Sequence, residues 1–278
     1  MFLFVVIITT LVYVLTKAAG YSSSYAVIAL VIATVSSVGS YFYSDKIVLA
    51  TAGAKPITKE SAPEVFNILE NLSIGAGIKM PRLYLIHDAV PNAFATGRDP
   101  KHAVVAVTSG LIQKLNKVEL EGVLAHELSH VKNLDTRLMM VTAVLVGFIA
   151  ILSDLFMRHL FFRGDDRNGK AGLFFLVIGI VLAILTPIAA SLIQLAVSRK
   201  REFLADASGV LLTRYPDGLA QALEKIASDP HPNIEATNST AHLYIINPFK
   251  GKSAGHWFTS LFNTHPPVQE RIKILREM

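Results

Sequence analysis

The sequence predicts a mostly helical α+β protein in which four transmembrane helices accompany one polar domain that carries a small β-sheet. Three observations lead to this class. The 278-residue chain is 52% hydrophobic and only 17% charged, whereas soluble domains carry about 25% charged residues. Its mean hydropathy is +0.46, and its apolar residues are gathered into four long stretches. The polar remainder shows the spacing patterns of helices and short strands.

The composition also excludes several classes of function. The chain has no cysteine, which rules out disulfide frameworks, thiolate metal sites, iron–sulfur clusters and a cysteine nucleophile. The net charge of +5 is as compatible with anionic lipid as with nucleic acid. Because no basic patch interleaved with aromatic residues is evident, we expect a lipid bilayer and no nucleic acid as partner.

The four apolar stretches approach or reach the roughly 20 residues that cross the hydrocarbon core of a bilayer. They are residues 2–16, 25–43, 138–157 and 172–197. The first is short and resembles a signal peptide, but it lacks a charged leading segment and a small-residue cleavage site. The last two could form a buried hairpin of a soluble core, but their length without Lys or Arg exceeds that of ordinary core helices. We therefore expect two transmembrane hairpins.

These hairpins divide the chain into four parts. They are a transmembrane hairpin at 1–43, a polar segment at 44–137, a second hairpin at 138–197 and a polar segment at 198–278. An even number of spans separates the polar segments, so both lie on one side of the membrane and can form one domain. Lys and Arg beside the spans number eight on that side and five in the opposite loops. This bias predicts a multi-pass protein of the cell membrane with its polar domain in the cytoplasm.

Two helices are predicted in the first polar segment. Ser61-Ala-Pro-Glu64 matches a capping box with proline in the first turn, which predicts a helix to about Leu72. The other begins at Asn116 and has apolar residues at helical spacing as far as Val131. Strands are predicted at 82–86, 92–96 and 102–108, and further helices at 202–212, 217–228 and 267–276.

The helix from Asn116 contains the motif His126-Glu127-Leu128-Ser129-His130. Residues four apart share one face of a helix, so the two imidazoles can bind a single Zn²⁺. Glu127 lies about 100° around the helix from His126, where it can hold a water at the metal without being a strong ligand itself. The alternative is a pair of core or surface histidines with ordinary hydrogen-bond partners.

A hydrolytic zinc site needs a third protein ligand, and Glu202-Phe-Leu-Ala-Asp206 starts soon after the fourth apolar stretch. Glu202 can complete the zinc shell, and Asp206, on the same helix face, can accept the far ring N–H of a ligand histidine. On spacing alone, both could equally be solvated carboxylates beside Arg199–Arg201. The second hairpin favours the ligand role, because it would bring residues 126–130 and 202–206 together at the membrane surface.

Four segments resemble the HtpX family of membrane zinc metalloproteases, which are stress-linked quality-control enzymes related to the CAAX-processing proteases of eukaryotes. The segments are HELSH at 126–130, NAFATG at 92–97, SRKREFLADA at 198–207 and THPPVQERI at 264–272. The resemblance covers nearly the whole chain. It implies a zincin-like cytoplasmic metalloprotease domain that holds one Zn²⁺ per chain and cleaves misfolded or damaged membrane proteins.

Carried over by position, the resemblance implies that His126, His130 and Glu202 bind the zinc and that Glu127 is the general base. A water activated by zinc has a pKa near about 7, and Glu127 would take its proton. In this scheme Asp206 accepts the far ring N–H of one ligand histidine and fixes its tautomer.

The resemblance also places Asn92 and His265 near the scissile carbonyl as catalytic residues. His265 could instead belong to a turn that starts a helix, and Asn92 could cap a turn after Pro91. Residues 92–97 could form an edge strand that pairs with an extended substrate backbone. The predicted substrate-binding residues are Asn92, Ala93, Phe94 and Ala95.

Two other functions stay open. The first is a prenyl-peptide endopeptidase of the CAAX type, although those relatives have more spans. The second is a non-catalytic membrane scaffold or transporter that contains a structural zinc. Transport sites usually lie at mid-membrane with buried polar groups, whereas Asp154 and Gln194 lie near the ends of their apolar stretches.

Overall fold

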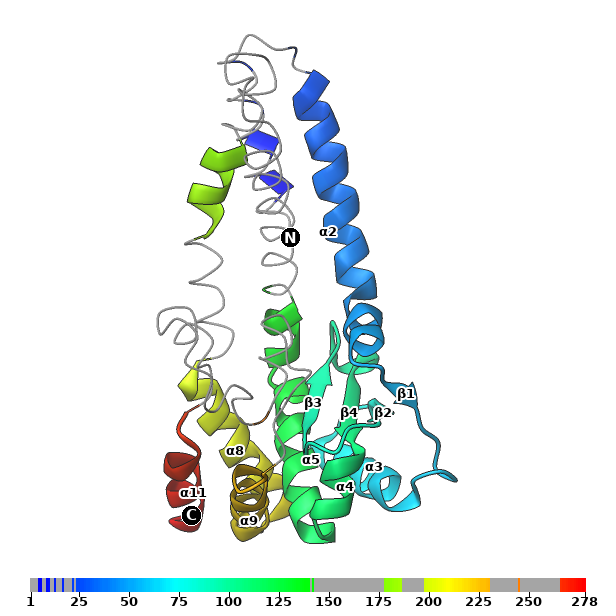
Figure 1. Cartoon of the computed structure of the whole chain (residues 1–278), viewed down its shortest axis with the longest axis vertical. Coiled ribbons are helices and arrows are strands. Elements are labelled where there is room, and N and C mark those ends of the chain that lie inside the picture. Colours follow the sequence, from blue (N-terminus) through cyan, green and yellow to red (C-terminus); the bar gives the residue numbers. More distant parts are fainter. Residues whose placement is uncertain are drawn as a thin grey trace. The chain divides into compact units, whose positions relative to one another are not determined.

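The computed structural model describes most of the polar part of the chain and shorter pieces of the apolar stretches (Figure 1). Described are residues 24–140, 178–186, 198–230 and 266–278, with single residues or pairs at 5–6, 9–10, 13, 17, 22, 142 and 245. Contacts divide the chain into two units. One comprises Met1–Ser44 and Val141–Ile193, and the other comprises Asp45–Met140 and Gln194–Met278.

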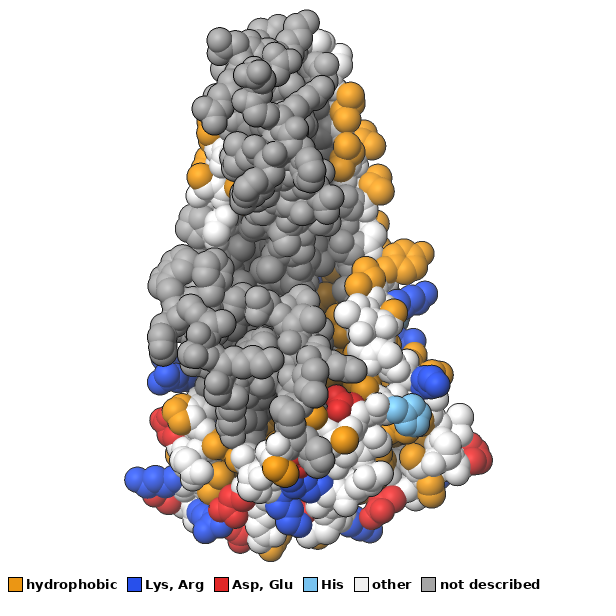
Figure 2. Space-filling model, viewed as in Figure 1, with side chains coloured by type: hydrophobic (Ala, Val, Ile, Leu, Met, Phe, Trp, Pro, Cys, Tyr) orange, Lys and Arg blue, Asp and Glu red, His pale blue; other side chains and the backbone are white. Residues whose placement is uncertain are grey.

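The longest described element of the first unit is the helix α2, Ser24–Thr51, whose last residues extend into the second unit. The predicted apolar stretch 25–43 lies inside α2. Many of its large apolar side chains are exposed, and they form the orange band along α2 in Figure 2. Within the described part of the chain, no helix meets both the length and the apolarity needed to cross a membrane. Most of the other three predicted stretches lies outside the described residues.

Within the described residues of the second unit, four strands form a mixed sheet that makes up one layer. Its strands are β1 (Lys55–Pro56), β2 (Arg82–Ile86), β3 (Ala93–Thr96) and β4 (Val104–Thr108), in the order β1-β2-β4-β3. The pair β2–β4 is parallel, and the other two pairs are antiparallel. The three predicted strands are confirmed, although β4 begins two residues late because Pro100–His102 form a 3₁₀ turn capped by Asp99. Among the described strands, β3 lies at an edge of the sheet.

Helices pack against the sheet, and the central helix α5 is buried among them (Figure 1). They are α3 (Pro63–Ala76), α4 (Ser109–Lys114), α5 (Lys117–Lys132), α8 (Arg199–Thr213), α9 (Pro216–Ala227) and α11 (Val268–Arg276). Helix α5 packs against α8, α9, α3 and β3, and α11 packs on α9 and α8. Helix α9 comes very close to α5 at Gly122, where an added Cβ would lie 2.7 Å from the backbone nitrogen of Leu219. The site therefore rests on a helix held from several sides.

The start of α5 is firmly capped. The Asn116 side chain accepts the backbone N–H of Glu119, and the Glu119 carboxylate accepts the backbone N–H of Asn116. The capping box predicted at Ser61–Glu64 is wrong. Helix α3 has Ala62 as its N-cap residue, with no side-chain cap, because the Ser61 hydroxyl bonds instead with the backbone of Thr58.

Candidate metal centre

Helix α5 carries His126, Glu127 and His130 into the interior of the second unit. The three side chains belong to residues with 3–6% exposure, because α8, α9, α3 and β3 surround this helix. Buried ionisable groups are strongly unfavourable unless they are paired or bind a metal. The partners of these three side chains therefore indicate what the site binds.

Helix α8 supplies the acidic half of the site. The Glu202 carboxylate lies 3.7 Å from His126 Nε2 and 3.6 Å from His130 Nε2. The close approach of α8 to α5 depends on Gly209, where an added Cβ would lie 3.2 Å from the backbone nitrogen of His126. The structure thus brings together the two segments that the sequence places 72 positions apart, from His130 to Glu202.

Both imidazoles are oriented by a carboxylate on the far side of the ring. His126 Nδ1 lies 2.8 Å from Asp206, and His130 Nδ1 lies 2.9 Å from Asp135. These partners assign the ring proton to Nδ1 in each histidine, which leaves a lone pair on each Nε2. The two Nε2 atoms lie only 3.2 Å apart. Two lone pairs at this distance need a cation or a proton between them.

The donor set fits zinc. Two imidazole nitrogens and a carboxylate oxygen are usual zinc ligands, and a tetrahedral ion with bonds near 2.0–2.1 Å separates its ligand atoms by about 3.3 Å. The ligand atoms of His126, His130 and Glu202 all lie within 4.8 Å of one another. Their closest separations are 3.2 Å, 3.6 Å and 3.7 Å. These three residues would hold the ion.

The charge around His130 also favours a bound cation. Burial alone would lower the pKa of His130, but Asp135, Glu202 and Glu127 raise it to about 9. Three carboxylates close to one imidazole leave an excess of negative charge in the buried site. Without a metal, a proton on His130 compensates that charge, and a divalent cation would replace the proton.

Glu127 lies beside the proposed ligands and is buried. Burial raises the pKa of Glu127, while His126 and His130 partly offset the rise, and the backbone N–H of Ala95 also stabilises its charged form. A carboxylate with a raised pKa is better suited to exchange protons near neutral pH. The Ala95 contact also places Glu127 at the edge strand β3.

Three site residues were missed by sequence reasoning: Asp135, Arg201 and Arg271. Asp135 is fully buried and bonds to His130, while Arg201 in turn bonds to Asp135. Arg271 of α11 lies 3.4 Å from Glu202 and donates two hydrogen bonds to Asp206. Arg271 lies in the THPPVQERI segment, and the resemblance of that segment to the family is the signal that could have identified it.

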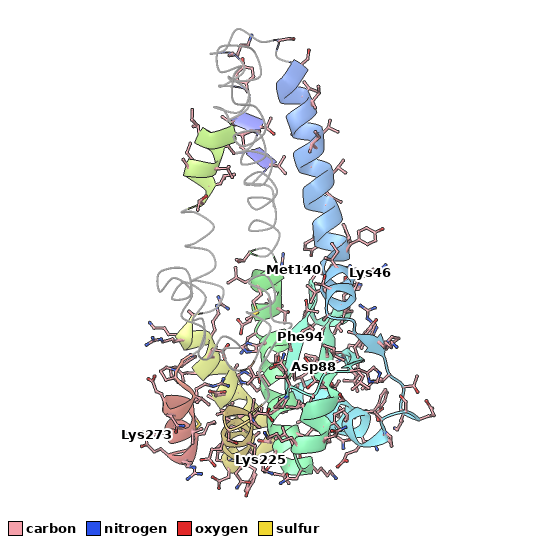
Figure 3. The ribbon with its side chains drawn as sticks, viewed as in Figure 1. Lys46, Asp88, Phe94, Met140, Lys225 and Lys273 are labelled. Atoms are coloured by element: carbon pink, nitrogen blue, oxygen red, sulfur yellow. The ribbon has the colours of Figure 1, made fainter. Side chains whose placement is uncertain are left out.

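Asn92 is buried immediately before β3. Its backbone N–H donates to the Thr108 hydroxyl, its carbonyl accepts the Thr108 N–H, and its side-chain oxygen accepts the backbone N–H of Ile245. Ala93 and Ala95 pack into the main core, whereas the Phe94 side chain packs on the other face of the sheet with Leu49. Figure 3 labels Phe94 on β3, the strand that contacts α5.

The structure brings together five of the predicted site residues, which are His126, Glu127, His130, Glu202 and Asp206. It places Ala95, in β3, next to Glu127. His265 lies outside the described residues, so its predicted role stays a prediction. Among the described residues, the cluster of His126, His130 and Glu202 is the one group of three or more His, Asp or Glu with metal-ligand geometry.

Comparisons with known proteins agree with this geometry. The chain is 48% identical over 239 residues to a protein named Protease HtpX homolog from Dictyoglomus thermophilum, covering 86% of this chain and 77% of the relative. A protein of the same name from Syntrophobacter fumaroxidans is 49% identical over 257 residues, covering 90% and 89%. One from Pyrococcus furiosus is 46% identical over 255 residues, covering 91% and 86%.

A solved structure has a similar fold. The crystal structure of S. mikatae Ste24p matches with a TM-score of 0.55 at 17% identity, over 96% of this chain. This chain spans 62% of the length of that one. The model of Peptidase family M48 matches residues 59–278, which include every residue of the candidate metal centre. The chain is therefore a peptidase that belongs to family M48.

Proposed function

We propose that this peptidase is a membrane-embedded, zinc-dependent endopeptidase that cleaves misfolded or damaged membrane proteins at the cytoplasmic face of the cell membrane. His126, His130 and Glu202 hold the zinc, Glu127 is the general base, and Asp206 orients His126. One observation carries the proposal. Two Nε2 lone pairs and a carboxylate converge in a buried site, beside a further carboxylate that touches an edge strand.

The proposed chemistry is hydrolysis of a peptide bond. When bound, zinc lowers the pKa of a water and polarises a carbonyl group. Glu127 accepts a proton from the attacking water and passes it to the leaving nitrogen, so one carboxylate serves both steps. Its position next to the three ligands, and its raised pKa, support this role.

Strand β3 supplies the docking edge for the substrate backbone. The Thr108 N–H donates to the Asn92 carbonyl, so Asn92 and Thr108 form a hydrogen-bonded pair. Such pairs alternate along an antiparallel ladder, and Ala93 and Ala95 therefore direct their backbone groups away from β4. The Ala95 N–H bonds to Glu127, so an extended peptide would pair through its own backbone with the Ala95 carbonyl and the backbone groups of Ala93. That mode tolerates many side chains, which suits unfolded substrates.

The oxyanion that develops during the attack needs donors in addition to the metal. We assign this role to the side-chain amide of Asn92 and to His265. Asn92 is buried immediately before β3, the strand in which Ala95 lies beside Glu127. His265 is proposed from the THPPVQERI segment alone.

The membrane topology is a proposal as well. Four transmembrane helices at 2–16, 25–43, 138–157 and 172–197 would divide the chain into hairpins at 1–43 and 138–197 and polar segments at 44–137 and 198–278. Exposed apolar side chains along α2 support a lipid environment for its first part. The names of the relatives are those of HtpX proteases.

The full chain, purified in detergent and loaded with zinc, tests this function. We expect it to cleave an unfolded membrane protein faster than a farnesylated CAAX peptide, and the Glu127→Gln variant to cleave neither. Faster cleavage of the farnesylated peptide would overturn the substrate assignment. A zinc-loaded chain that cleaves neither substrate would overturn the proposed function itself.

A further inference from the structure

The segment that follows α5 contains a backbone feature that the catalytic scheme does not use. Helix α5 ends at Lys132, Asn133 is its C-cap residue, and Leu134 has φ of 61°. Residues 135–140 are helical again, and Figure 3 labels Met140 at the end of that piece. The left-handed region is disfavoured for leucine, and such positions persist only where the surrounding structure requires them.

This break decides where Asp135 lies. In an uninterrupted helix, the residue five positions after His130 would point about 140° away from it around the axis. Asp135 instead accepts a hydrogen bond from His130 Nδ1 at 2.9 Å, and Asp135 is completely buried. The left-handed residue turns the chain back so that this carboxylate faces the imidazole.

Asp135 is itself held from the other helix of the site. One of its oxygens faces His130, and the other accepts a hydrogen bond from Arg201 Nη1. Arg201 precedes the proposed ligand Glu202 in the first turn of α8. The single Asp135 carboxylate therefore joins the end of α5 to the start of α8, next to a ligand on each helix.

We propose that Asp135 and Arg201 are positioning residues for the metal, and that the left-handed break at Leu134 exists to present Asp135 to His130. Asp135 fixes the ring proton of His130 on Nδ1, so that Nε2 faces the metal. Arg201 holds the carboxylate in that orientation and keeps Glu202 in reach. This inference rests on the proposed zinc site and adds the residues that align it.

The first test measures the zinc dissociation constant of the purified full chain by competition with a chelator. We expect Asp135→Ala to bind zinc about 10–100-fold more weakly, as is usual when the partner of a ligand histidine is lost. Arg201→Gln should also weaken binding, and Arg201→Lys should restore much of it because a cation again faces Asp135. Lys200→Gln, on an exposed neighbour, is the matched control and should leave the constant unchanged.

A double variant separates positioning from a purely structural ion pair. Asp135→Ala removes the buried carboxylate that the partly exposed Arg201 binds, whereas Asp135→Ala with Arg201→Ala removes both members of the ion pair and should recover the thermal stability lost with the unbalanced charge. We expect zinc binding to stay weak in the double variant, because His130 still lacks its acceptor. Recovery of wild-type zinc affinity in the double variant would overturn the positioning role.

The break is tested at Leu134. Leu134→Gly keeps access to the left-handed region, whereas Leu134→Val disfavours it. We expect the glycine variant to bind zinc like the wild type and the valine variant to bind more weakly. A folded valine variant with wild-type affinity would contradict the assignment of the break. If the wild type itself binds no zinc, the proposed function fails instead.

Discussion

Arg271 donates from Nε and Nη2 to both carboxylate oxygens of Asp206, at 2.8 Å and 2.6 Å, and the two side chains are each only 2% exposed. Asp206 in turn lies 2.8 Å from His126 Nδ1. Burial alone would raise the pKa of Asp206, but Arg271 and His126 lower it to about 2. The C-terminal helix is thereby tied to the metal centre through one arginine.

Removal of this arginine is expected to be severe. Arg271→Gln would leave Asp206 and Glu202 without their buried cation, and breaking such a pair costs about 3–5 kcal/mol. The free energy of unfolding, measured by denaturant titration in detergent, should fall by that amount. Arg276→Gln is the control on the same helix, since its pair with Glu224 is exposed and is worth about 0–1 kcal/mol. Equal effects of the two variants would contradict this account.

Glu127→Gln separates metal binding from proton transfer. Gln keeps the shape of the side chain but cannot accept a proton, so zinc content should stay at the wild-type level. A general base contributes about 100–10,000-fold to the rate, and the cleavage of casein should fall by a factor in that range. Wild-type turnover in a preparation free of other proteases would remove Glu127 from the role of base.

Asn92→Asp tests the donor role of the side-chain amide. The carboxylate still accepts the Ile245 N–H but offers no donor to an oxyanion. Loss of one such donor lowers kcat by about 100–1000-fold, and we expect this fall with unchanged zinc content. If Asn92→Asp keeps wild-type kcat while Asn92→Ala unfolds the chain, Asn92 supports the structure and not the reaction.

Removal of the metal should make stability depend on pH. The pKa of His130 in the metal-free chain is raised from 6.5 to about 9, so its contribution is fully present below pH 6.5 and is lost as the pH rises towards 9. This loss amounts to about 3 kcal/mol. With zinc bound, His130 is neutral throughout and the loss should disappear. Denaturant titrations at pH 6.5 and 9, with and without chelator, measure the difference; a metal-free chain equally stable at both values would contradict it.

Much of the second unit could be predicted from local patterns. Strand β2 has the predicted bounds 82–86, and the helices at 199–213, 216–227 and 268–276 differ from the predictions by at most a few residues at either end. Apolar spacing and Pro or Gly punctuation are local signals, so they are visible in one sequence. The two-residue strand β1 carries no such signal. The capping box predicted at Ser61 is wrong because the Ser61 hydroxyl donates to the Thr58 carbonyl instead.

The site residues likewise fall into those that local patterns predict and those that depend on tertiary packing. The histidines and Glu202 follow from ligand chemistry and helix spacing, which a sequence displays. Asp135 could not be predicted, because its position depends on the left-handed conformation of Leu134. A leucine in a sequence does not indicate such a turn. Arg271 could not be assigned either, since only tertiary packing of α11 against α8 brings it to Asp206.

The metal content of the Glu202→Ala variant shows whether the three residues share one ion. We expect one zinc per wild-type chain, and a variant that folds but retains almost none after dialysis against a weak chelator. One tightly held zinc per chain in Glu202→Ala would contradict the convergence of His126, His130 and Glu202 on a single ion.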